Sequence, residues 1–358
     1  MKKKIIFIIS VFSLFVGCQK TPTTTVIKDA HFDDEVLENE TTESWEKMVT
    51  ANIYTENVNE TFMVGNKTIT FKGKKVLPDR TDGLYTYKAV NTSYDEYFNN
   101  MDFLFGEYIN DMYVPVDYFT GELEIGTKSV KCDNNLLIHM SIQNSRANGK
   151  DVMTSASKVY FWVDWNPRIA DSEVPVNMTN DEAKKEADEI IDKIGVTGFE
   201  FEKCVYGHNP VSEGNEPRMD DITVVYRQHL QGIPVETYYS NNSQCQTAVT
   251  FVSRGISRVY IIEYAYEKIA KNSQCITYEE ALECFKNYVN SCDYYDGAIF
   301  TEISFQYVIK VSYVDGENVR MVIPCYKFDT LLDPVLNNMY PDVYVDARDG
   351  KIYSEPYR

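Results

Sequence analysis

Residues that could perform acid–base, nucleophilic or metal chemistry are present in this chain, but not at the spacings that such chemistry requires. The chain contains no GxSxG nucleophile elbow, no GxxxxGKS or GxxxxGKT phosphate loop and no GxGxxG dinucleotide loop. No histidine has a partner at the spacing of an HExxH metal site; the four histidines are His31, His139, His208 and His229. The sequence therefore favours a protein that is not an enzyme, and it indicates neither a cofactor nor a metal site.

Carboxylates are the other candidates for chemistry. The chain has 54 Asp and Glu residues, so pairs must occur somewhere. A hydrolase would need two carboxylates that face each other across a cleft. We rank it third among the candidate functions, below binding to an envelope protein and binding to a carbohydrate. The segment DARDGKIY, with Asp346 and Asp349, lacks the regular oxygen positions of an EF-hand loop. We interpret that segment as a turn.

Cys18 has the clearest chemical setting in the chain. Lys2, Lys3 and Lys4 precede an apolar run, residues 5–16, that is shorter than the roughly 20 residues needed to span a bilayer. The run ends in LFVGC, which resembles the lipobox of bacterial lipoproteins. The resemblance implies a signal peptide over residues 1–17 and an acylated Cys18. An ordinary secretory signal with an unrelated cysteine is the alternative.

Lipidation would place the protein in the cell envelope, anchored on the outer face of the cytoplasmic membrane, with the membrane as one partner. Residues 18–44 are Thr-rich and then acidic, a composition typical of a disordered tether. The formal net charge is -19, and loss of the three lysines of the signal makes it more negative still. Such a surface repels phosphate backbones, so we expect no nucleic-acid partner.

The seven cysteines beyond Cys18 have no CxxC spacing, and their odd number means that they cannot all pair within one chain. They are Cys132, Cys204, Cys245, Cys275, Cys284, Cys292 and Cys325. We interpret most of them as small buried hydrophobic residues, with a disulfide framework as the alternative.

Two helices are expected to begin in the same way. The stretch MTNDEAKKEADEIIDKIG starts at residue 178, and ITYEEALECFKNYVNSCD starts at residue 276. In each, a Thr (Thr179 or Thr277) is followed three residues later by a Glu, which is the capping-box arrangement. Apolar residues then recur at helical spacing, at Ala183, Ala187, Ile190, Ile191 and Ile194 in the first helix and at Ala281, Phe285, Tyr288, Val289 and Cys292 in the second.

The segments after the two helices also match in order. Each contains β-branched and aromatic runs with an Ile-Pro pair, ending at Pro234 or Pro324, and each closes in a turn, at Gly255 or Gly350. A Pro in such a run suggests an edge strand or a bulge. We therefore expect a repeated unit of one helix packed on three or four antiparallel strands, once over 178–270 and again over 275–358.

These two segments resemble PepSY-type domains. The resemblance rests on TNDEAKKEADEIIDKIG followed by QGIPVE, and on TYEEALECFKNYV followed by VYVDARDGKIY. As a tandem pair on an anchored chain, they are similar to the extracytoplasmic regulatory proteins that restrain an envelope-sensing histidine kinase in Gram-positive bacteria. The overall layout is also similar to uncharacterised lipoproteins of low-GC Gram-positive anaerobes. The resemblance implies binding or inhibition of a partner protein, without catalysis.

Residues 45–170 read as an α+β domain of mostly β structure. Alternating runs predict strands, for example ASKVYFWVDWNP, and SYDEYFNNMDFLFGEYI predicts one helix with an aromatic face that belongs to a core. The fold class expected for the whole chain is therefore α+β, with antiparallel sheets each packed by a helix.

Tyrosine is abundant, with 27 residues, and the pairs Tyr238-Tyr239 and Tyr294-Tyr295 are adjacent in the chain. In a strand, one member of each pair points outward, where it could contact a partner or stack on a sugar ring. Simple strand propensity is the alternative explanation. We thus expect a binding or regulatory protein that contacts an envelope protein, with cell-wall or carbohydrate binding as the second function.

Overall fold

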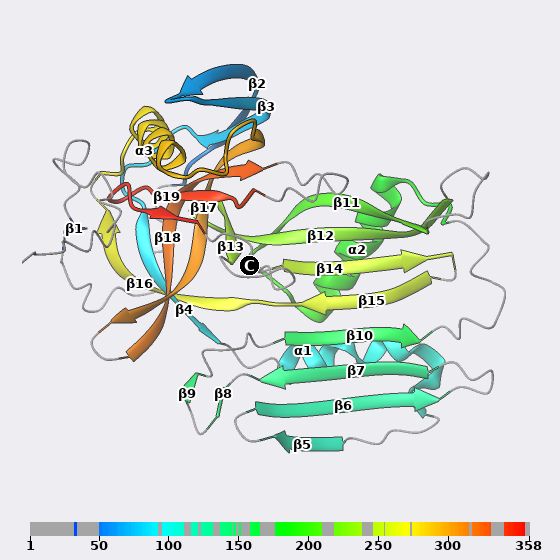
Figure 1. Cartoon of the computed structure of the whole chain (residues 1–358). Helices are drawn as coiled ribbons and strands as arrows, with labels where there is room; N and C mark the ends of the chain where they lie inside the picture. The colour runs from blue at the N-terminus through cyan, green and yellow to red at the C-terminus, as the bar shows by residue number, and fades with distance from the viewer. Residues whose placement is uncertain are drawn as a thin grey trace, which may run out of the picture.

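The protein belongs to the α+β class, and most of its ordered elements are strands (Figure 1). The structure is a computed structural model that describes residues 32–33, 50–91, 95–110, 116–120, 123–131, 137–144, 146–147, 150–151, 158–164, 176–209, 218–237, 246–253, 255–272, 274–314, 317–330 and 340–354. None of the helices in these ranges is long and apolar enough to cross a membrane.

The helical elements are α1 (Asp95–Asn100), the 3-10 helix η2 (Met101–Asn110), α2 (Asn180–Ile194) and α3 (Tyr278–Ser291). The strands are β1 (Phe32–Asp33), β2 (Ile53–Val64), β3 (Lys67–Pro78), β4 (Tyr85–Asn91), β5 (Val116–Thr120), β6 (Leu123–Lys131), β7 (Leu137–Asn144), β8 (Arg146–Ala147), β9 (Lys150–Asp151), β10 (Lys158–Asp164), β11 (Phe199–Asn209), β12 (Arg218–Leu230), β13 (Ile233–Thr237), β14 (Gln246–Val252), β15 (Gly255–Ile261), β16 (Tyr264–Asn272), β17 (Ile299–Val314), β18 (Glu317–Thr330), β19 (Val343–Asp346) and β20 (Ile352–Tyr353).

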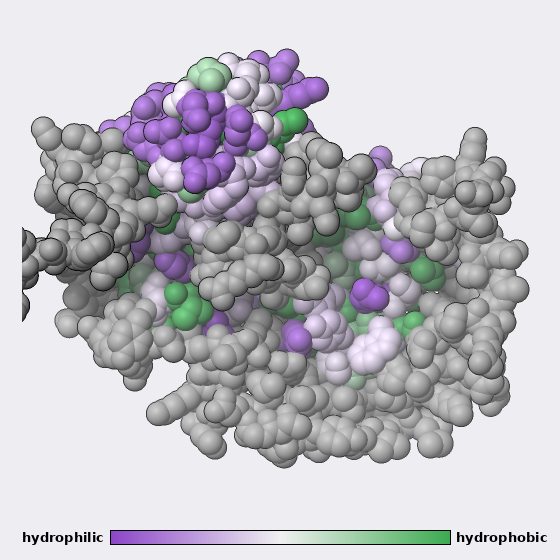
Figure 2. Space-filling model, viewed as in Figure 1, coloured by the Kyte–Doolittle hydropathy of each residue, from purple (hydrophilic) through white to green (hydrophobic). Residues whose placement is uncertain are grey.

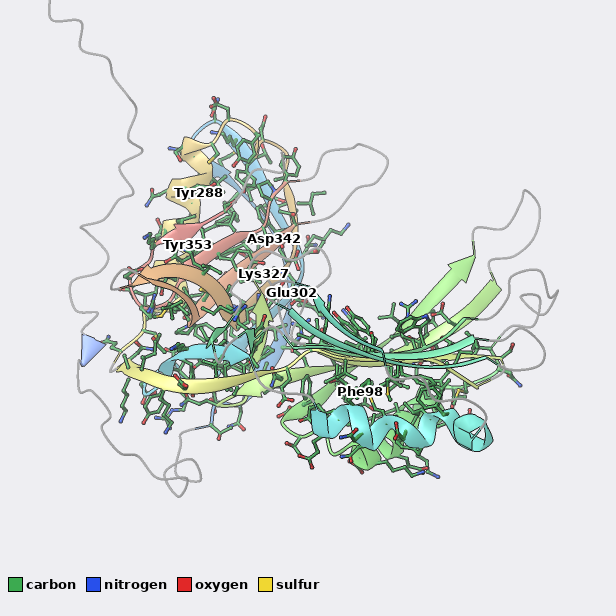
Figure 3. The ribbon with its side chains drawn as sticks, turned by 90° about the horizontal axis from the view of Figure 1, so that it is seen from below. Phe98, Tyr288, Glu302, Lys327, Asp342 and Tyr353 are labelled. Atoms are coloured by element: carbon green, nitrogen blue, oxygen red, sulfur yellow. The ribbon has the colours of Figure 1, made fainter. Side chains whose placement is uncertain are left out.

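One sheet, called here the first sheet, is antiparallel throughout and runs β11-β12-β14-β15-β10-β7-β6-β5. Helices α1 and α2 cover one of its faces, as the view from below shows for α1 near Phe98 (Figure 3). The buried face of α2 consists of Ala183, Ala187, Ile190, Ile191 and Ile194. This is the apolar stripe predicted from the spacing of the sequence.

A second sheet is built around the long antiparallel pair β17–β18. Strand β17 has β3 and β13 as parallel neighbours, while β18 has β4 and β19 along its other edge. Helix α3 covers this sheet, and the Phe285 ring stacks on that of Phe328 with centroids 4.2 Å apart. Pro324 lies in β18 between the residues paired with β4 and those paired with β19, so its missing N–H interrupts neither ladder.

Both helices begin as the sequence predicts. The side chains of Thr179 and Thr277 each accept a hydrogen bond from the backbone N–H three residues on, and Glu182 and Glu280 reach back to the N-cap backbone. Helix α2 ends at Gly195, which is left-handed with φ 84°. The predicted turns at Gly255 and Gly350 connect β14 to β15 and β19 to β20.

Residues 45–170 do not form the separate domain that we expected. Residues of β3 and β4 belong to the hydrophobic core of the second sheet, whereas Met101, Phe105, Met140, Val159 and Phe161 belong to the core of the first. Strand pairing explains the division, because β3 pairs with β17 and β4 with β16, while β10 pairs with β15. The predicted single helix is also divided into α1 and η2, with a non-helical backbone at Gly106.

The two sheets are joined by a tight turn between β12 and β13. Gln231 and Gly232 form this turn with positive φ values of 52° and 78°, and Gln231 is the one non-glycine residue with positive φ in the described ranges. The turn enters the core of the second sheet, where β13 pairs with β17. A Cβ on Gly232 would lie 2.4 Å from the carbonyl oxygen of Ala51, so only glycine fits there.

The cysteines in the described ranges are free thiols, and four of these five are buried. Burial raises the pKa of Cys275 to about 12, and it also raises the pKa of Cys284. Cys132 and Cys245 lie outside the described residues.

Candidate binding surface

The residues singled out from the sequence do not come together in one site. Cys18, Tyr238 and Tyr239 lie outside the described residues, as do the predicted signal peptide and nearly all of the tether. Tyr294 and Tyr295 follow α3 in a turn rather than in a strand. The side chain of Tyr294 is 42% exposed, but that of Tyr295 is fully buried, and its hydroxyl donates to the carbonyl oxygen of Pro341 over 3.0 Å. Tyr295 is therefore a core residue and offers no contact surface.

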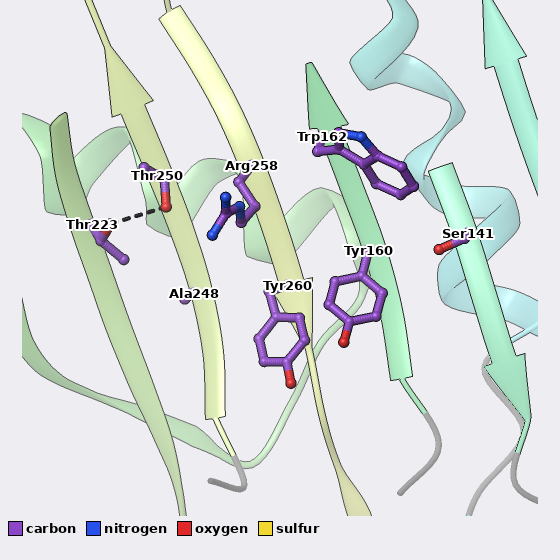
Figure 4. A pocket seen from close by; sticks show the side chains of 8 residues that line it. All are labelled: Ser141, Tyr160, Trp162, Thr223, Ala248, Thr250, Arg258 and Tyr260. Carbon is purple, nitrogen blue, oxygen red and sulfur yellow. Dashed lines mark hydrogen bonds between the residues drawn. The ribbon is translucent and has the colours of Figure 1, made fainter. Parts of the chain in front are cut away.

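A different set of residues forms a concave surface on the first sheet. The face opposite α1 and α2 is hollowed, with a volume of about 680 Å³ (Figure 4). We call it the open face and define it by its lining residues, Ser141, Tyr160, Trp162, Thr223, Ala248, Thr250, Arg258 and Tyr260. In Figure 2 the hollow over β10, β14 and β15 contains hydrophilic and intermediate residues beside a few hydrophobic ones.

The register of five neighbouring strands places these side chains in two rows. One row crosses β10, β15, β14 and β12 through the residue pairs Trp162–Arg258, Arg258–Thr250 and Thr250–Thr223. The other crosses β7, β10, β15 and β14 through the pairs Ser141–Tyr160, Tyr160–Tyr260 and Tyr260–Ala248. The rows are two residues apart along each strand, so both lie on the same face.

Alternation along the strands explains the local sequence. In KVYFWVD, Val159 and Phe161 are buried in the core beneath α1 and α2, so Tyr160 and Trp162 must point to the other side. In β15, Val259 occupies the core in the same way between Arg258 and Tyr260. The hydrophobic core therefore orients the rings and the guanidinium of the open face.

The aromatic part of the open face contains a packed pair of rings. The rings of Tyr160 and Tyr260 are tilted by 37° with centroids 4.6 Å apart. The Nζ of Lys158 lies 5.3 Å from the centre of the Tyr160 ring, which is a cation–π distance. Paired rings of this kind present a large area at low cost in conformational entropy.

Polar groups complete the open face. The hydroxyls of Thr223 and Thr250 are hydrogen-bonded to one another at 2.9 Å, as the dashed line in Figure 4 shows. Among the described lining residues, Arg258 carries the only charge, and it is exposed. The carboxylate of Asp221, on the same face of β12 as Thr223, lies against Gly207 of the paired strand β11. The described lining is therefore locally cationic in an acidic protein.

Sequence reasoning did not single out Trp162 or Arg258. The alternating pattern of β10 predicts a strand, and this pattern alone places Tyr160 and Trp162 on one face. The chain carried no local signal that β10 lies beside β15, because residues 158–164 and 255–261 are far apart in sequence.

A second polar cluster lies in the second sheet around Lys327, which is labelled with Asp342 in Figure 3. The Nζ of Lys327 is 3.0 Å from Glu236, 3.4 Å from Asp329 and 3.4 Å from Asp342. Burial raises the pKa of Asp329 to about 7, against the opposing effect of Lys327. Because these carboxylates surround a buried lysine rather than facing each other across a cleft, we interpret the cluster as a structural link between β13 and β18.

No group of three or more His, Cys, Asp or Glu side chains in the described part of the chain is placed to hold a metal ion. No carboxylate belongs to the described lining of the open face. The surface offers rings, hydroxyls and one guanidinium, which are groups suited to contact.

Comparison with known proteins gives a fold relationship only. No family model and no curated protein matches the chain. An uncharacterised protein from Eubacterium rectale is similar in structure with a TM-score of 0.51 at 15% identity, over 82% of this chain and 93% of that one. The C-terminal domain of Bacillus megaterium YpeB matches with a TM-score of 0.36 at 9% identity, over 75% of this chain and 99% of that domain. The first likeness indicates a shared fold, and the second is too distant to support more.

Proposed function

We propose that this chain is a lipid-anchored binding or regulatory protein of the cell envelope, held on the outer face of the cytoplasmic membrane and acting without catalysis. The anchor is Cys18, at the end of the apolar leader. The observation that carries the binding role is the open face, a hollow of about 680 Å³ lined by aromatic rings, hydroxyls and a guanidinium. A volume of this size lies within the range of ligand sites.

The body of the protein is proposed to be two PepSY-like units, over 178–270 and 275–358. Supporting this, α2 is followed by the antiparallel series β11-β12-β14-β15, and α3 by β17-β18-β19-β20. Each series follows a helix that begins with the same capping box. The short motifs quoted above are the other support.

An envelope protein is the first candidate partner. The supporting feature is β11, which pairs only with β12 among the described strands. Its side chains Phe201, Val205 and Tyr206 are exposed. An edge strand with exposed apolar side chains can accept an extended segment of another protein as an added strand.

A cell-wall glycan or other carbohydrate is the second candidate partner, and the open face is the feature that favours it. Its rings and hydroxyls match the alternating apolar and polar surfaces of a sugar. The two candidates use different surfaces, so variants can separate them.

The test uses the immobilised chain to capture components of an envelope extract from the source bacterium. If the partner is a glycan on the open face, we expect capture to fall when Trp162→Ala and Arg258→Gln are combined, and to persist in Tyr54→Ala, which alters an exposed aromatic residue of β2. If the partner is a protein that adds a strand to β11, we expect the paired substitution to leave capture unchanged. Capture that is unchanged by the paired substitution, or absent from the unaltered chain, would remove the open face as the binding surface. A Cys18→Ser variant should leave the membrane fraction and lose incorporation of labelled fatty acid.

A further inference from the structure

We propose that the open face binds a short wall glycan whose sugar rings carry carboxylate groups, an inference that rests on the binding role proposed above. Three features of the open face lead to this ligand: its dimensions, its aromatic rows and its local charge. Each restricts the chemistry of what can occupy the hollow.

The dimensions favour a chain-like ligand that crosses the strands. The lining residues come from five neighbouring strands, β7, β10, β15, β14 and β12. At about 4.8 Å between strands, the hollow is roughly 19 Å wide, and the two rows are about 7 Å apart. That footprint is long and narrow. It fits a few sugar rings in line better than a single compact molecule.

The side-chain types favour sugar over an apolar peptide. Ala248 is the one aliphatic residue of the described lining, and the others are rings, hydroxyls and Arg258. A saccharide ring presents apolar C–H groups on its faces and hydroxyls around its edge. The rings of Trp162 and Tyr260 can contact such faces, while Ser141, Thr223 and Thr250 offer hydrogen-bonding groups at the edges.

The local charge favours an anionic glycan. Arg258 is centred between the aromatic side and the threonine side of the open face, with Trp162 opposite it on β10 and Thr250 opposite it on β14. Lys158 adds a second positive charge next to Tyr160. The rest of the protein is strongly acidic, with a formal net charge of -19, but exposed charges more than about 8 Å apart are largely screened at physiological salt. A guanidinium pairs with a carboxylate through two parallel hydrogen bonds.

The wall glycan supplies a matched pair of probes. Its repeating unit is N-acetylglucosamine joined to N-acetylmuramic acid, which carries a lactyl carboxylate. We would titrate the purified chain with the peptide-free tetrasaccharide of two such units by isothermal calorimetry. Chitotetraose, which has the same β-1,4 linkage without the lactyl group, is the neutral control. We expect the tetrasaccharide to bind at least about tenfold more tightly, as the loss of a charge-assisted hydrogen bond would produce.

Variants test whether the binding occurs on the open face. Arg258→Gln should weaken tetrasaccharide binding about tenfold and bring it to the level of chitotetraose. Trp162→Ala should weaken both sugars. Two matched controls are Arg80→Gln and Tyr54→Ala, which change an exposed arginine and an exposed tyrosine outside the first sheet. Both variants should bind the two sugars as the unaltered chain does. Circular dichroism and thermal melting verify that each variant is folded.

The outcomes distinguish this proposal from the binding role itself. Equal affinity for the two sugars, with no effect of Arg258→Gln, would overturn the carboxylate and leave a neutral glycan site. Binding of neither sugar, with capture from the envelope extract still dependent on Trp162 and Arg258, would overturn the glycan and favour a protein ligand on the open face. Binding of neither sugar and no dependence of capture on these residues would overturn the glycan and the open face as a binding surface, and absence of any capture by the unaltered chain would overturn the binding role as well.

Discussion

The hydroxyl of Tyr307, in the middle of β17, donates a hydrogen bond to Oε1 of Gln231 over 3.0 Å. The same oxygen accepts from the hydroxyl of Tyr87 at 3.1 Å and from the backbone N–H of Tyr85 at 2.9 Å. Gln231 belongs to the turn between β12 and β13, so one side-chain amide connects the first sheet to β4 and β17 of the second. Three donors from the second sheet converge on it in a buried position.

Replacing Gln231 by Ala should destabilise the protein strongly. The substitution removes the acceptor that the Tyr85 N–H and the hydroxyls of Tyr87 and Tyr307 share, and each group left unsatisfied costs about 1–3 kcal/mol. We expect the free energy of unfolding in urea to fall by about 2–3 kcal/mol. Tyr307→Phe is the matched comparison, because it removes one donor and leaves the acceptor satisfied, at a cost of about 1 kcal/mol. Equal losses of stability in the two variants would show that the Gln231 amide does not stabilise the connection between the two sheets.

Removing the capping box of α3 should destabilise the protein less than Gln231→Ala does, because the loss is confined to one end of the helix. Thr277 accepts from the N–H of Glu280 at 3.3 Å, and Glu280 accepts from the N–H of Thr277 at 2.8 Å. Thr277→Ala removes the first bond and should lower the free energy of unfolding by about 1 kcal/mol. Thr277→Ser keeps the hydroxyl and should be nearly neutral in the same urea titration. If the Ser and Ala variants are equally destabilised, packing of the Thr methyl group is responsible instead of the cap.

The raised pKa of the Asp329 carboxyl predicts an unusual pH dependence of the free energy of unfolding. Its pKa is raised to about 7, mainly by burial, whereas an unfolded aspartate has a pKa of about 3.9. Between these values the folded protein binds more protons than the unfolded chain, so this group makes stability fall as pH rises from about 4 to about 7. Asp329→Asn should remove this slope from a plot of unfolding free energy against pH.

The control for that measurement is Asp293→Asn, at an exposed position. We expect its stability profile to follow that of the unaltered chain. A profile in which Asp329→Asn also follows the unaltered chain would mean that Lys327 keeps the Asp329 carboxylate ionised in the folded state.

The free cysteines should differ in reactivity. The thiolate is the reactive form, and burial raises the pKa of Cys275 to about 12, while Cys325 is fully buried. Cys204 is partly exposed. Iodoacetamide at pH 8, followed by mass spectrometry, should label Cys204 first in the folded protein and all three at similar rates in concentrated urea. Rapid native labelling of Cys275 would contradict the packing of α3 on the second sheet.

Local features were predictable from the sequence and long-range pairings were not. The capping boxes at Thr179 and Thr277 and the turn at Gly350 depend on residues within a few positions of each other, so the spacing of the sequence is sufficient to predict them. The division of residues 45–170 between two cores depends on the parallel pairing of Thr70 with Ile299, for which no nearby residue carries a signal.

For the open face, too, the local features could be predicted from the sequence and the long-range contacts could not. Alternation in β10 predicts that Tyr160 and Trp162 share a face. That Tyr160 lies against Tyr260, and Trp162 beside Arg258, depends on a strand register that brings distant segments together. One member of the pair Tyr294 and Tyr295 is exposed, as expected, but the pair follows α3 outside any strand, and the ring of Tyr295 packs against Phe300 and Tyr340.

The pairing of β3 with β17 has a consequence for how the chain reaches its native state. A polypeptide emerges from the ribosome N-terminus first, so the hairpin of β2 and β3 is made long before the strand that completes its sheet. Closing so large a loop is slow, and an unpaired strand edge invites association with other chains in the meantime. Shortening the protein from its C-terminal end so that β17 is lost would therefore leave β3 without its parallel neighbour, and the damage would appear at the opposite end of the sequence from the cut.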